Sequence, residues 1–164
     1  MAKINNVLFI CSGNTCRSPF AEYYAKWLKK TKYKDKLNGV NFDSAGLYHY
    51  YEQPQEGTVK FLRSKGISID DFQAKEVDED LLDNHDLILG FEKKWHINKL
   101  KRKFKNSKEL GTKLHLLRKF AGFSKDLDIP DPFHLKEKEY NAVLKKIEIA
   151  VEKVVEKIIE INNE

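Results

Sequence analysis

Apolar residues along this chain follow two periods, one typical of buried strands and the other typical of amphipathic helices. Val7 to Ile10 is a continuous apolar run of strand length that ends at Cys11, as expected for a strand buried on both faces. Soon afterwards, apolar side chains recur at the spacing of one helix face: Phe20, Tyr23, Tyr24, Trp27 and Leu28. Ser18 can cap this helix, Pro19 suits its first turn, and Glu22 faces the positive end of its dipole. The pattern therefore predicts a strand, a short loop and a helix in succession.

The same alternation continues to the end of the chain. Further strands are predicted at residues 40–43, 86–89 and 113–117, and further helices at 58–65, 92–102 and 136–161. The last helix carries a long apolar stripe, which is more typical of a core face than of a coiled-coil partner surface. Alternating strands and helices predict an α/β fold, with a four-stranded parallel sheet and helices on both faces in a flavodoxin-like, doubly wound arrangement. We expect a single domain over residues 1–164, with ligands outside the carboxyl ends of the strands.

The composition suits one compact domain, since the chain has 164 residues, a mass of 19.2 kDa and 41% hydrophobic residues. No apolar run approaches the roughly 20 residues of a membrane span, and the N-terminal residues lack the features of a signal peptide. Cys11 and Cys16 are too few and too close together to form the disulfide framework of a secreted protein. We therefore expect a cytoplasmic protein without a membrane partner.

The chain carries a formal net charge of +5, which favours anionic partners without naming one. Basic residues concentrate in residues 93–108, which contain no acidic residue, whereas residues 78–86 are largely acidic. A solvated helix face is the usual meaning of such a run, and a docking patch for an anionic partner is the alternative. No nucleic acid is expected as a partner.

The loop between the first strand and the first helix, residues 11–18, reads CSGNTCRS. Gly13 and Asn14 permit a tight bend that turns successive backbone N–H groups inward, which creates a nest for an anion. The following helix adds its dipole, and the planar fork of Arg17 can hold two oxygens of a phosphoryl group. The same positive field favours the thiolate form of Cys11. The loop therefore predicts attack of sulfur on phosphorus, with a phosphocysteine intermediate and inversion at each of two steps.

The other loop residues are expected to support this chemistry. Asn14 holds the strained backbone, and the Ser18 hydroxyl hydrogen-bonds the thiolate. The phosphate group is expected to contact Ser12, Gly13, Thr15 and Cys16. Cys16 has two open interpretations: a small buried core residue, or a resolving thiol that traps oxidised Cys11 as a reversible disulfide.

Three segments, CSGNTCRSPFAE at residues 11–22, DSAG at 43–46 and DPF at 131–133, together resemble the low-molecular-weight protein tyrosine phosphatase family. The resemblance implies a four-stranded parallel sheet, hydrolysis of phosphotyrosine in proteins without metal or other cofactor, and inorganic phosphate or vanadate as ligands. It maps the nucleophile onto Cys11, the phosphate-binding arginine onto Arg17 and the general acid onto Asp131. It also implies that Ser44 helps to hold Asn14. We expect a monomer.

The chemistry of the leaving group independently favours Asp131 as the acid. Expulsion of a tyrosinate, whose conjugate acid has a pKa near 10, is helped by a proton delivered to the bridging oxygen. A carboxylic acid between Pro130 and Pro132 sits on a rigid loop, and its carboxylate can later activate water. Asp128 is the nearest substitute.

Several positions depart from the family pattern. Phe133 and His134 replace a frequent Tyr pair, Lys75 replaces an arginine before the third strand, and Glu92 replaces an aspartate after it. These departures leave the catalytic groups in place but question the usual packing around the pocket. The aromatic segment at residues 47–51 is expected to form the variable pocket wall, with these rings beside the substrate: Tyr50, Tyr51 and Phe133.

Four alternatives remain beside this interpretation. Thiol-linked arsenate reduction needs further cysteines near the third strand, and residues 75–92 contain none. Protein arginine phosphatases on the same scaffold carry a threonine where most tyrosine phosphatases have an aliphatic residue, and Thr15 stands at this position. A phosphate-dependent binding module using the basic stretch near Lys101 would make Cys11 dispensable. Metal catalysis finds little support, because the scattered histidines are expected to be surface or packing residues: His49, His85, His96, His115 and His134.

Overall fold

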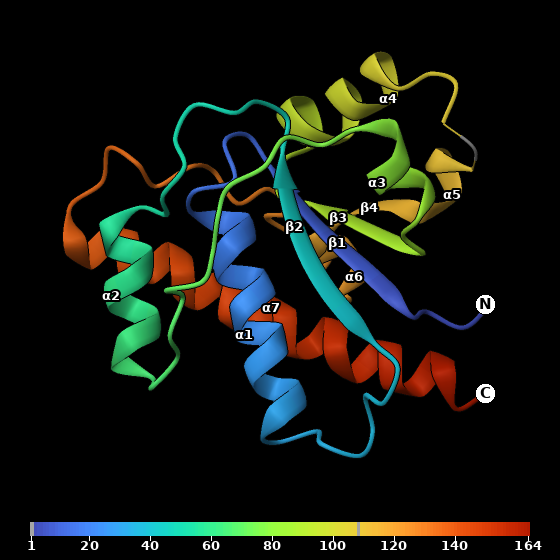
Figure 1. The fold of residues 1–164 in the computed structure, drawn as a ribbon, viewed down its shortest axis with the longest axis horizontal. Coiled ribbons are helices and arrows are strands. Elements are labelled where there is room, and N and C mark those ends of the chain that lie inside the picture. Colours follow the sequence, from blue (N-terminus) through green and yellow to red (C-terminus); the bar gives the residue numbers. More distant parts are fainter. Residues whose placement is uncertain (1, 108) are drawn as a thin grey trace.

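A single four-stranded sheet with helices on both faces forms the computed structural model, which describes residues 2–107 and 109–164 (Figure 1). All strand pairs are parallel, and the strand order is β2-β1-β3-β4. The strands are β1 (Asn6–Cys11), β2 (Asn41–Gly46), β3 (Leu87–Gly90) and β4 (Leu114–Leu116). The predicted α/β fold is therefore confirmed.

The helices separate and follow these strands. They are α1 (Arg17–Lys30), α2 (Glu56–Ser64), α3 (Glu79–Asp83), the π-helix η1 (Lys93–Asn98), α4 (Lys99–Lys103), α5 (Leu110–Lys113), α6 (Leu117–Phe120) and α7 (Glu137–Asn162). Among the described residues, no helix combines the length and the apolar character needed to cross a bilayer.

Successive side chains of β1 supply two separate cores, because residues of a strand point alternately to the two faces of its sheet. Val7 and Phe9 belong to the larger core with α1 and α7. Leu8 and Ile10 belong to the smaller core with α3, η1 and α4. The central strand is thus held rigidly on both faces, and its carboxyl end carries Cys11.

The long apolar stripe of α7 is buried in the protein's own core, as the sequence pattern predicts. The buried apolar residues of this helix are Tyr140, Leu144, Ile147, Ala150, Val151, Val154, Val155, Ile158 and Ile161. Because these side chains pack against α1 and its neighbours, the stripe is not a free coiled-coil surface.

Several predicted boundaries are wrong for local reasons. The fourth strand spans only Leu114–Leu116, since the flanking residues of the predicted segment belong to α5 and α6. The helix predicted at 92–102 is divided into η1 and α4. The short helices α3, α5 and α6 are too brief to show an apolar period.

The start of α1 also differs from the prediction. Cys16 is its N-cap residue and makes no side-chain cap hydrogen bond, and Ser18 lies within the helix. The hydroxyl of Ser18 contacts Cys11 and Asn14 instead. The carboxylate of Glu22 is buried beside Ser44 and therefore serves a side chain rather than the helix dipole.

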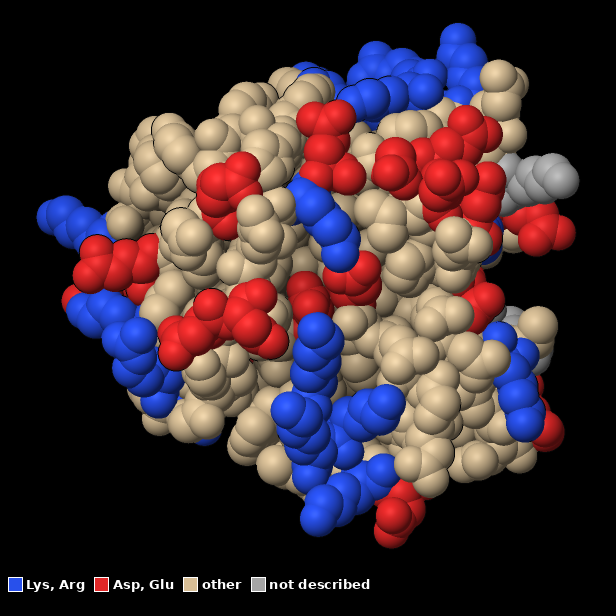
Figure 2. Space-filling view, in the orientation of Figure 1, with Lys and Arg blue, Asp and Glu red and all other residues tan. Residues whose placement is uncertain are grey.

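Charged side chains lie in two neighbouring surface regions. Figure 2 shows Lys and Arg gathered over α4 and Asp and Glu gathered below them over α3. Lys101, Arg102 and Lys103 are exposed on α4, so this part of the basic stretch is a solvated helix face.

Candidate active site

The loop between β1 and α1 lies at the carboxyl edge of the central strand. The carbonyl oxygens of Cys11 and Ser12 accept hydrogen bonds from the backbone amides of Leu47 and Tyr48, at 3.0 and 2.9 Å. The Thr15 carbonyl accepts from the Gln55 amide at 2.7 Å. In a trans peptide, the N–H points away from the preceding C=O, so these outward carbonyls turn the next amides toward the inside of the loop. This backbone arrangement suits an anion.

Asn14 ties the loop together from within. It is fully buried and has a left-handed φ of 55°, which asparagine tolerates better than most residues. Its Nδ2 donates to the hydroxyls of Ser18 at 2.8 Å and Ser44 at 3.0 Å. Its Oδ1 accepts from the Lys75 backbone amide at 3.0 Å. The structure thus brings Asn14, Ser18 and Ser44 into contact at the base of the loop.

The end of β2 must approach this loop closely. A Cβ atom on Gly46 would lie 2.8 Å from the Asn14 backbone nitrogen and 2.9 Å from the Gly13 carbonyl carbon. Such contacts cannot be relieved by rotating a side chain, because both partners are backbone atoms. Gly46 is therefore required for the loop to sit against β2.

Cys11 lies at the floor of the loop, with its sulfur 2.9 Å from the Ser18 hydroxyl oxygen. The Ser18 oxygen already accepts a hydrogen bond from Asn14, so its own proton is free to point at the sulfur. The arrangement gives the buried sulfur of Cys11 a hydroxyl donor.

Arg17 is almost fully buried and held by one of its nitrogens. Its Nη1 donates to Glu92 Oε2 at 2.7 Å and to the Ile129 carbonyl at 2.8 Å. A guanidinium has further donors on Nε and Nη2, which can form a bidentate pair with an oxyanion. In the sequence, Glu92 stood out only as a departure from the family pattern. In the structure it anchors Arg17, the candidate phosphate-binding residue.

Asp131 stands at the rim of a cavity of about 640 Å³ above the loop. Its Oδ1 accepts from the Phe133 backbone amide at 3.1 Å, while the following Pro132 is buried. The alternative acid, Asp128, accepts from the Lys93 amide at 2.9 Å and lines a different cavity. The cavity is lined by Ser12, Gly13, Thr15, Tyr50, Tyr51, Gln53, Gln55, Asp131 and Phe133.

The Cys16 thiol lies behind the loop in the larger core and does not line this cavity, so the expected contact of Cys16 with the phosphate group would involve its backbone amide. Its backbone amide follows the outward Thr15 carbonyl and stays part of the loop. Burial raises the pKa of Cys16 to about 12. Tyr140 approaches the sulfur at 3.0 Å, and both cysteines are free thiols.

Glu22 supports the loop one contact further out. Its Oε1 accepts from the Ser44 hydroxyl at 2.5 Å, and its other oxygen pairs with Lys26 at 2.5 Å. Burial raises the pKa of Glu22 above its ordinary value. Its position within the PFAE segment of the motif is the only sequence signal for this role.

His96 is a buried packing residue that also makes hydrogen bonds beside the loop. It is fully buried in η1, and its Nδ1 accepts from the backbone amides of Phe91 at 3.0 Å and Glu92 at 2.9 Å. The ring proton therefore resides on Nε2, which lies 3.2 Å from the Ser12 hydroxyl. Burial lowers the pKa of His96 to about 2, so the ring is neutral. No sequence signal distinguished it from the other histidines.

Comparison with known sequences identifies relatives across most of the chain. Residues 6–163 match the family described as low molecular weight phosphotyrosine protein phosphatase. The low molecular weight protein-tyrosine-phosphatase YfkJ of Bacillus subtilis is 37% identical over 134 residues, which cover 79% of this chain and 81% of YfkJ. Etp of Escherichia coli K12, with the same description, is 28% identical over 149 residues and 90% of each chain.

Solved structures agree with the sequence relatives. The crystal structure of YfkJ superimposes with a TM-score of 0.82 at 31% identity and covers 97% of both chains. The YwlE arginine phosphatase of Geobacillus stearothermophilus has a TM-score of 0.79 at 25% identity and covers 93% of this chain and 92% of its own. From the match across residues 6–163, we conclude that this chain belongs to the low molecular weight phosphotyrosine protein phosphatase family.

Proposed function

We propose that this protein hydrolyses phosphotyrosine in proteins through a phosphocysteine intermediate. The observation that carries the proposal is the Cys11 sulfur, 2.9 Å from a hydroxyl, within the same loop that leads into the anchored Arg17. Family membership and the cavity between Asp131 and the loop support the same activity.

In the first step, the Cys11 thiolate attacks phosphorus while the bond to the tyrosyl oxygen breaks. The loop amides and the Nε and Nη2 groups of Arg17 hold the remaining phosphoryl oxygens, whose charge they stabilise in the transition state. Asp131, as the carboxylic acid, gives its proton to the departing oxygen. The products are tyrosine and phosphocysteine.

In the second step, water attacks phosphorus on the side that tyrosine has vacated. The Asp131 carboxylate accepts a proton from this water, the sulfur–phosphorus bond breaks, and inorganic phosphate leaves. Ser18 is placed to hydrogen-bond the regenerated thiolate of Cys11. Acid and thiolate have then returned to their starting forms.

The Cys11→Ser variant tests this mechanism. Turnover of a phosphotyrosine peptide should fall by at least about 10⁴-fold, as is typical when a catalytic nucleophile is removed. Binding of phosphate or vanadate should persist, because the loop amides and Arg17 remain. Substantial turnover by the variant would contradict nucleophilic catalysis by Cys11.

Phosphoarginine is a second candidate substrate because of Thr15. Thr15 lines the cavity, and Gln55 Nε2 approaches its hydroxyl oxygen at 3.4 Å. An arginine phosphatase is among the structural relatives. Comparison of kcat/KM for phosphotyrosine and phosphoarginine peptides, in the wild type and Thr15→Ile, decides the preference. A fall in the phosphoarginine-to-phosphotyrosine ratio in the variant would assign this discrimination to Thr15.

We also propose redox control, a cytoplasmic location and a monomeric state. Peroxide would oxidise the Cys11 sulfur to a sulfenic acid, and attack by Cys16 would release water and form a disulfide that dithiothreitol reduces. The presence of two free thiols fits a reducing compartment. Burial of the α7 stripe within the chain's own core supports the monomer.

A further inference from the structure

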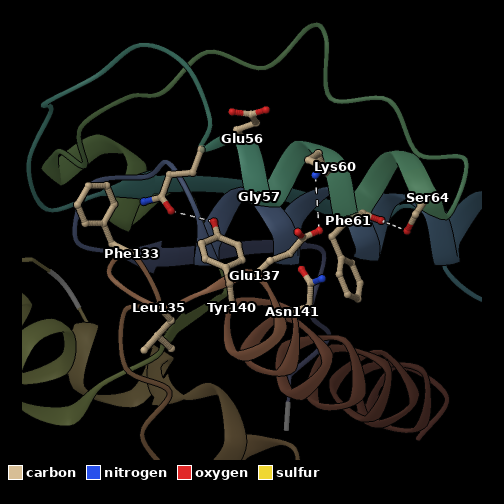
Figure 3. Close-up of a pocket in the computed structure, with 11 residues that line it drawn as sticks. Glu56, Gly57, Lys60, Phe61, Ser64, Phe133, Leu135, Glu137, Tyr140 and Asn141 are labelled. Atoms are coloured by element: carbon tan, nitrogen blue, oxygen red, sulfur yellow. Dashed lines mark hydrogen bonds and ion pairs between the residues drawn. The ribbon is translucent and has the colours of Figure 1, made fainter.

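A second cavity of about 790 Å³ lies between α2 and the start of α7, beside the candidate active site (Figure 3). Its walls include Gly57 and Phe61 from α2, Tyr140 from α7, and Leu135 from the segment before α7. A Cβ on Gly57 would lie 2.7 Å from the Tyr140 ring, so the glycine allows this ring to pack closely against α2. The cavity is therefore built from two helices and one connecting segment, and apolar side chains stand among polar and charged ones in its walls.

The two cavities share a wall. Gln55 and Phe133 line both of them. Gln55 is held on each side: its Nε2 approaches the Thr15 hydroxyl at 3.4 Å, and its Oε1 accepts from the Tyr140 hydroxyl at 2.8 Å. In Figure 3, this second bond is the dashed line that ends at the Tyr140 hydroxyl. A chain bound at the candidate active site would thus have the second cavity directly beside it.

Exposed apolar side chains gather around these two cavities. In the part of the chain that the structure describes, six large hydrophobic residues are exposed. Four of them line one or both cavities: Tyr50, Tyr51, Phe133 and Leu135. Trp95 and Ile149 lie elsewhere. Concentration of exposed apolar surface at one place is typical of an interaction site rather than of scattered surface residues.

An exposed ion pair lies among the residues that line the second cavity. Lys60 of α2 and Glu137 of α7 form an ion pair of 3.5 Å, which Figure 3 shows. Both side chains are largely exposed, and exposed pairs of this kind contribute little stability. Polar groups beside apolar ones suit a polypeptide whose backbone remains partly solvated while one side chain is buried.

The segment that bears the candidate acid also forms this site. Asp131 is followed by Phe133 in the shared wall and by Leu135 in the second cavity. Backbone hydrogen bonds hold the segment in a turn, with the Leu135 amide donating to the Pro132 carbonyl at 2.9 Å. A substrate that fills the second cavity would therefore contact the loop that carries Asp131.

We propose that the second cavity is a subsite for an apolar side chain of the phosphoprotein substrate, close in sequence to the phosphorylated residue. The inference rests on the proposed phosphatase function and adds a substrate preference to it. An extended peptide advances about 3.3 Å per residue and points alternate side chains to opposite sides, so only certain flanking positions can reach the cavity. The apolar residues in its walls favour an aliphatic or aromatic side chain.

The experiment uses phosphotyrosine peptides with glycine on both sides, into which one leucine is moved from position −4 to +4. The enzymes are the wild type, Leu135→Glu and Ile149→Glu, the last being a matched change of an exposed aliphatic residue outside both cavities. For the wild type, leucine at one favoured position should raise kcat/KM by roughly tenfold, as expected for a small apolar subsite. Leu135→Glu should lose this gain and Ile149→Glu should keep it.

Phenyl phosphate separates the two levels of the proposal, because it has no flanking residues. Failure of the wild type to hydrolyse phenyl phosphate and every phosphopeptide would overturn the phosphatase function itself. Hydrolysis without any dependence on the leucine position would overturn only the subsite, as would a gain that survives in Leu135→Glu. An equal gain from aspartate or lysine at the favoured position would contradict the apolar preference. Leu135→Ala provides a second test that adds no charge.

Discussion

His96 Nε2 lies 3.2 Å from the Ser12 hydroxyl, while Nδ1 of the same ring accepts the Phe91 and Glu92 amides. One neutral imidazole therefore joins the loop at residues 11–18 to Glu92, the residue that anchors Arg17. The two ring nitrogens contact segments that are far apart in the sequence, the loop at residues 11–18 and residues 91–92. A π-helix, which is frequent at functional sites, carries this side chain.

Replacing His96 separates these two connections. Asn retains an acceptor near the position of Nδ1, and Gln retains a donor near the position of Nε2. We expect both variants to lower kcat/KM. His96→Asn loses the contact with Ser12, so its loss is the larger one if that contact matters most. His96→Gln loses the contact with the Glu92 amide, so its loss is the larger one if that contact matters most. Steady-state kinetics on phenyl phosphate measures the difference, and unchanged kinetics in both variants would show that the contacts are only structural.

The same residue predicts how stability depends on pH. His96 has an ordinary pKa of 6.5, which folding lowers to about 2. Between these values the unfolded chain binds a proton that the folded chain does not, so His96 lowers the free energy of unfolding as pH falls below 6.5. The slope is up to about 1.4 kcal/mol per pH unit. Urea unfolding at pH 7.5 and 5.0 should show a smaller loss for His96→Gln than for the wild type, and equal losses would contradict a buried neutral ring.

Asp131 can be distinguished from Asp128 by the leaving group. Asp131→Asn should slow hydrolysis of phenyl phosphate by about 10²-fold or more, the range typical of general acid catalysis. It should slow nitrophenyl phosphate much less, because nitrophenolate leaves readily without a proton. Asp128→Asn is the matched control and should show no such selectivity. The opposite assignment would follow if only Asp128→Asn produced the selective loss.

Gly46→Ala should damage the site without unfolding the protein. Its Cβ would lie within 2.9 Å of backbone atoms of Asn14 and Gly13, so the loop must shift, and a displacement of about 1 Å can reduce the rate about 10²-fold. Gly111→Ala is the control, since its Cβ would meet no atom of the described residues within 4 Å. Circular dichroism and kcat/KM for both variants make the comparison. Full activity of Gly46→Ala would mean that the loop tolerates the displacement.

Disulfide formation at Cys16 should be slow and strongly dependent on pH. Attack on oxidised Cys11 needs the Cys16 thiolate, and burial raises the Cys16 pKa to about 12. The protein is given a short peroxide pulse at one pH and is then moved to pH 7, 8 or 9. The rate of disulfide closure should rise about tenfold per pH unit, because the thiolate fraction rises tenfold per unit below the pKa. Mass spectrometry follows closure, and dithiothreitol should restore activity.

Cys16→Ser is the control for this reaction. Without the second thiol, Cys11 can proceed to sulfinic acid, so dithiothreitol should restore less activity after the same exposure. Equal recovery in the wild type and the variant would leave Cys16 as a core residue only.

The sequence by itself determined the features that depend on neighbouring positions. Three patterns between near neighbours in the sequence were sufficient. The apolar run before Cys11 predicts a buried strand of the parallel sheet, and the CSGNTCRS segment predicts the anion-binding loop. The apolar stripe of α7 predicts the buried last helix. The short segments that contain Ser44 and Asp131 suggest a role for these residues only through the family resemblance. Each segment can be recognised because its residues are neighbours in the sequence.

Only the tertiary structure decided which distant side chains meet. Glu92 reaches Arg17, His96 reaches Ser12, and Tyr140 reaches Cys16, each pair joined across a large separation in the chain. A hydrogen bond needs its two atoms within about 3 Å, and such a distance depends on strand register and helix packing rather than on either local pattern. The same holds for two further features: the π-helix η1 packs against β3 and β4, and the wall shared by the two cavities depends on how α2 packs against α7.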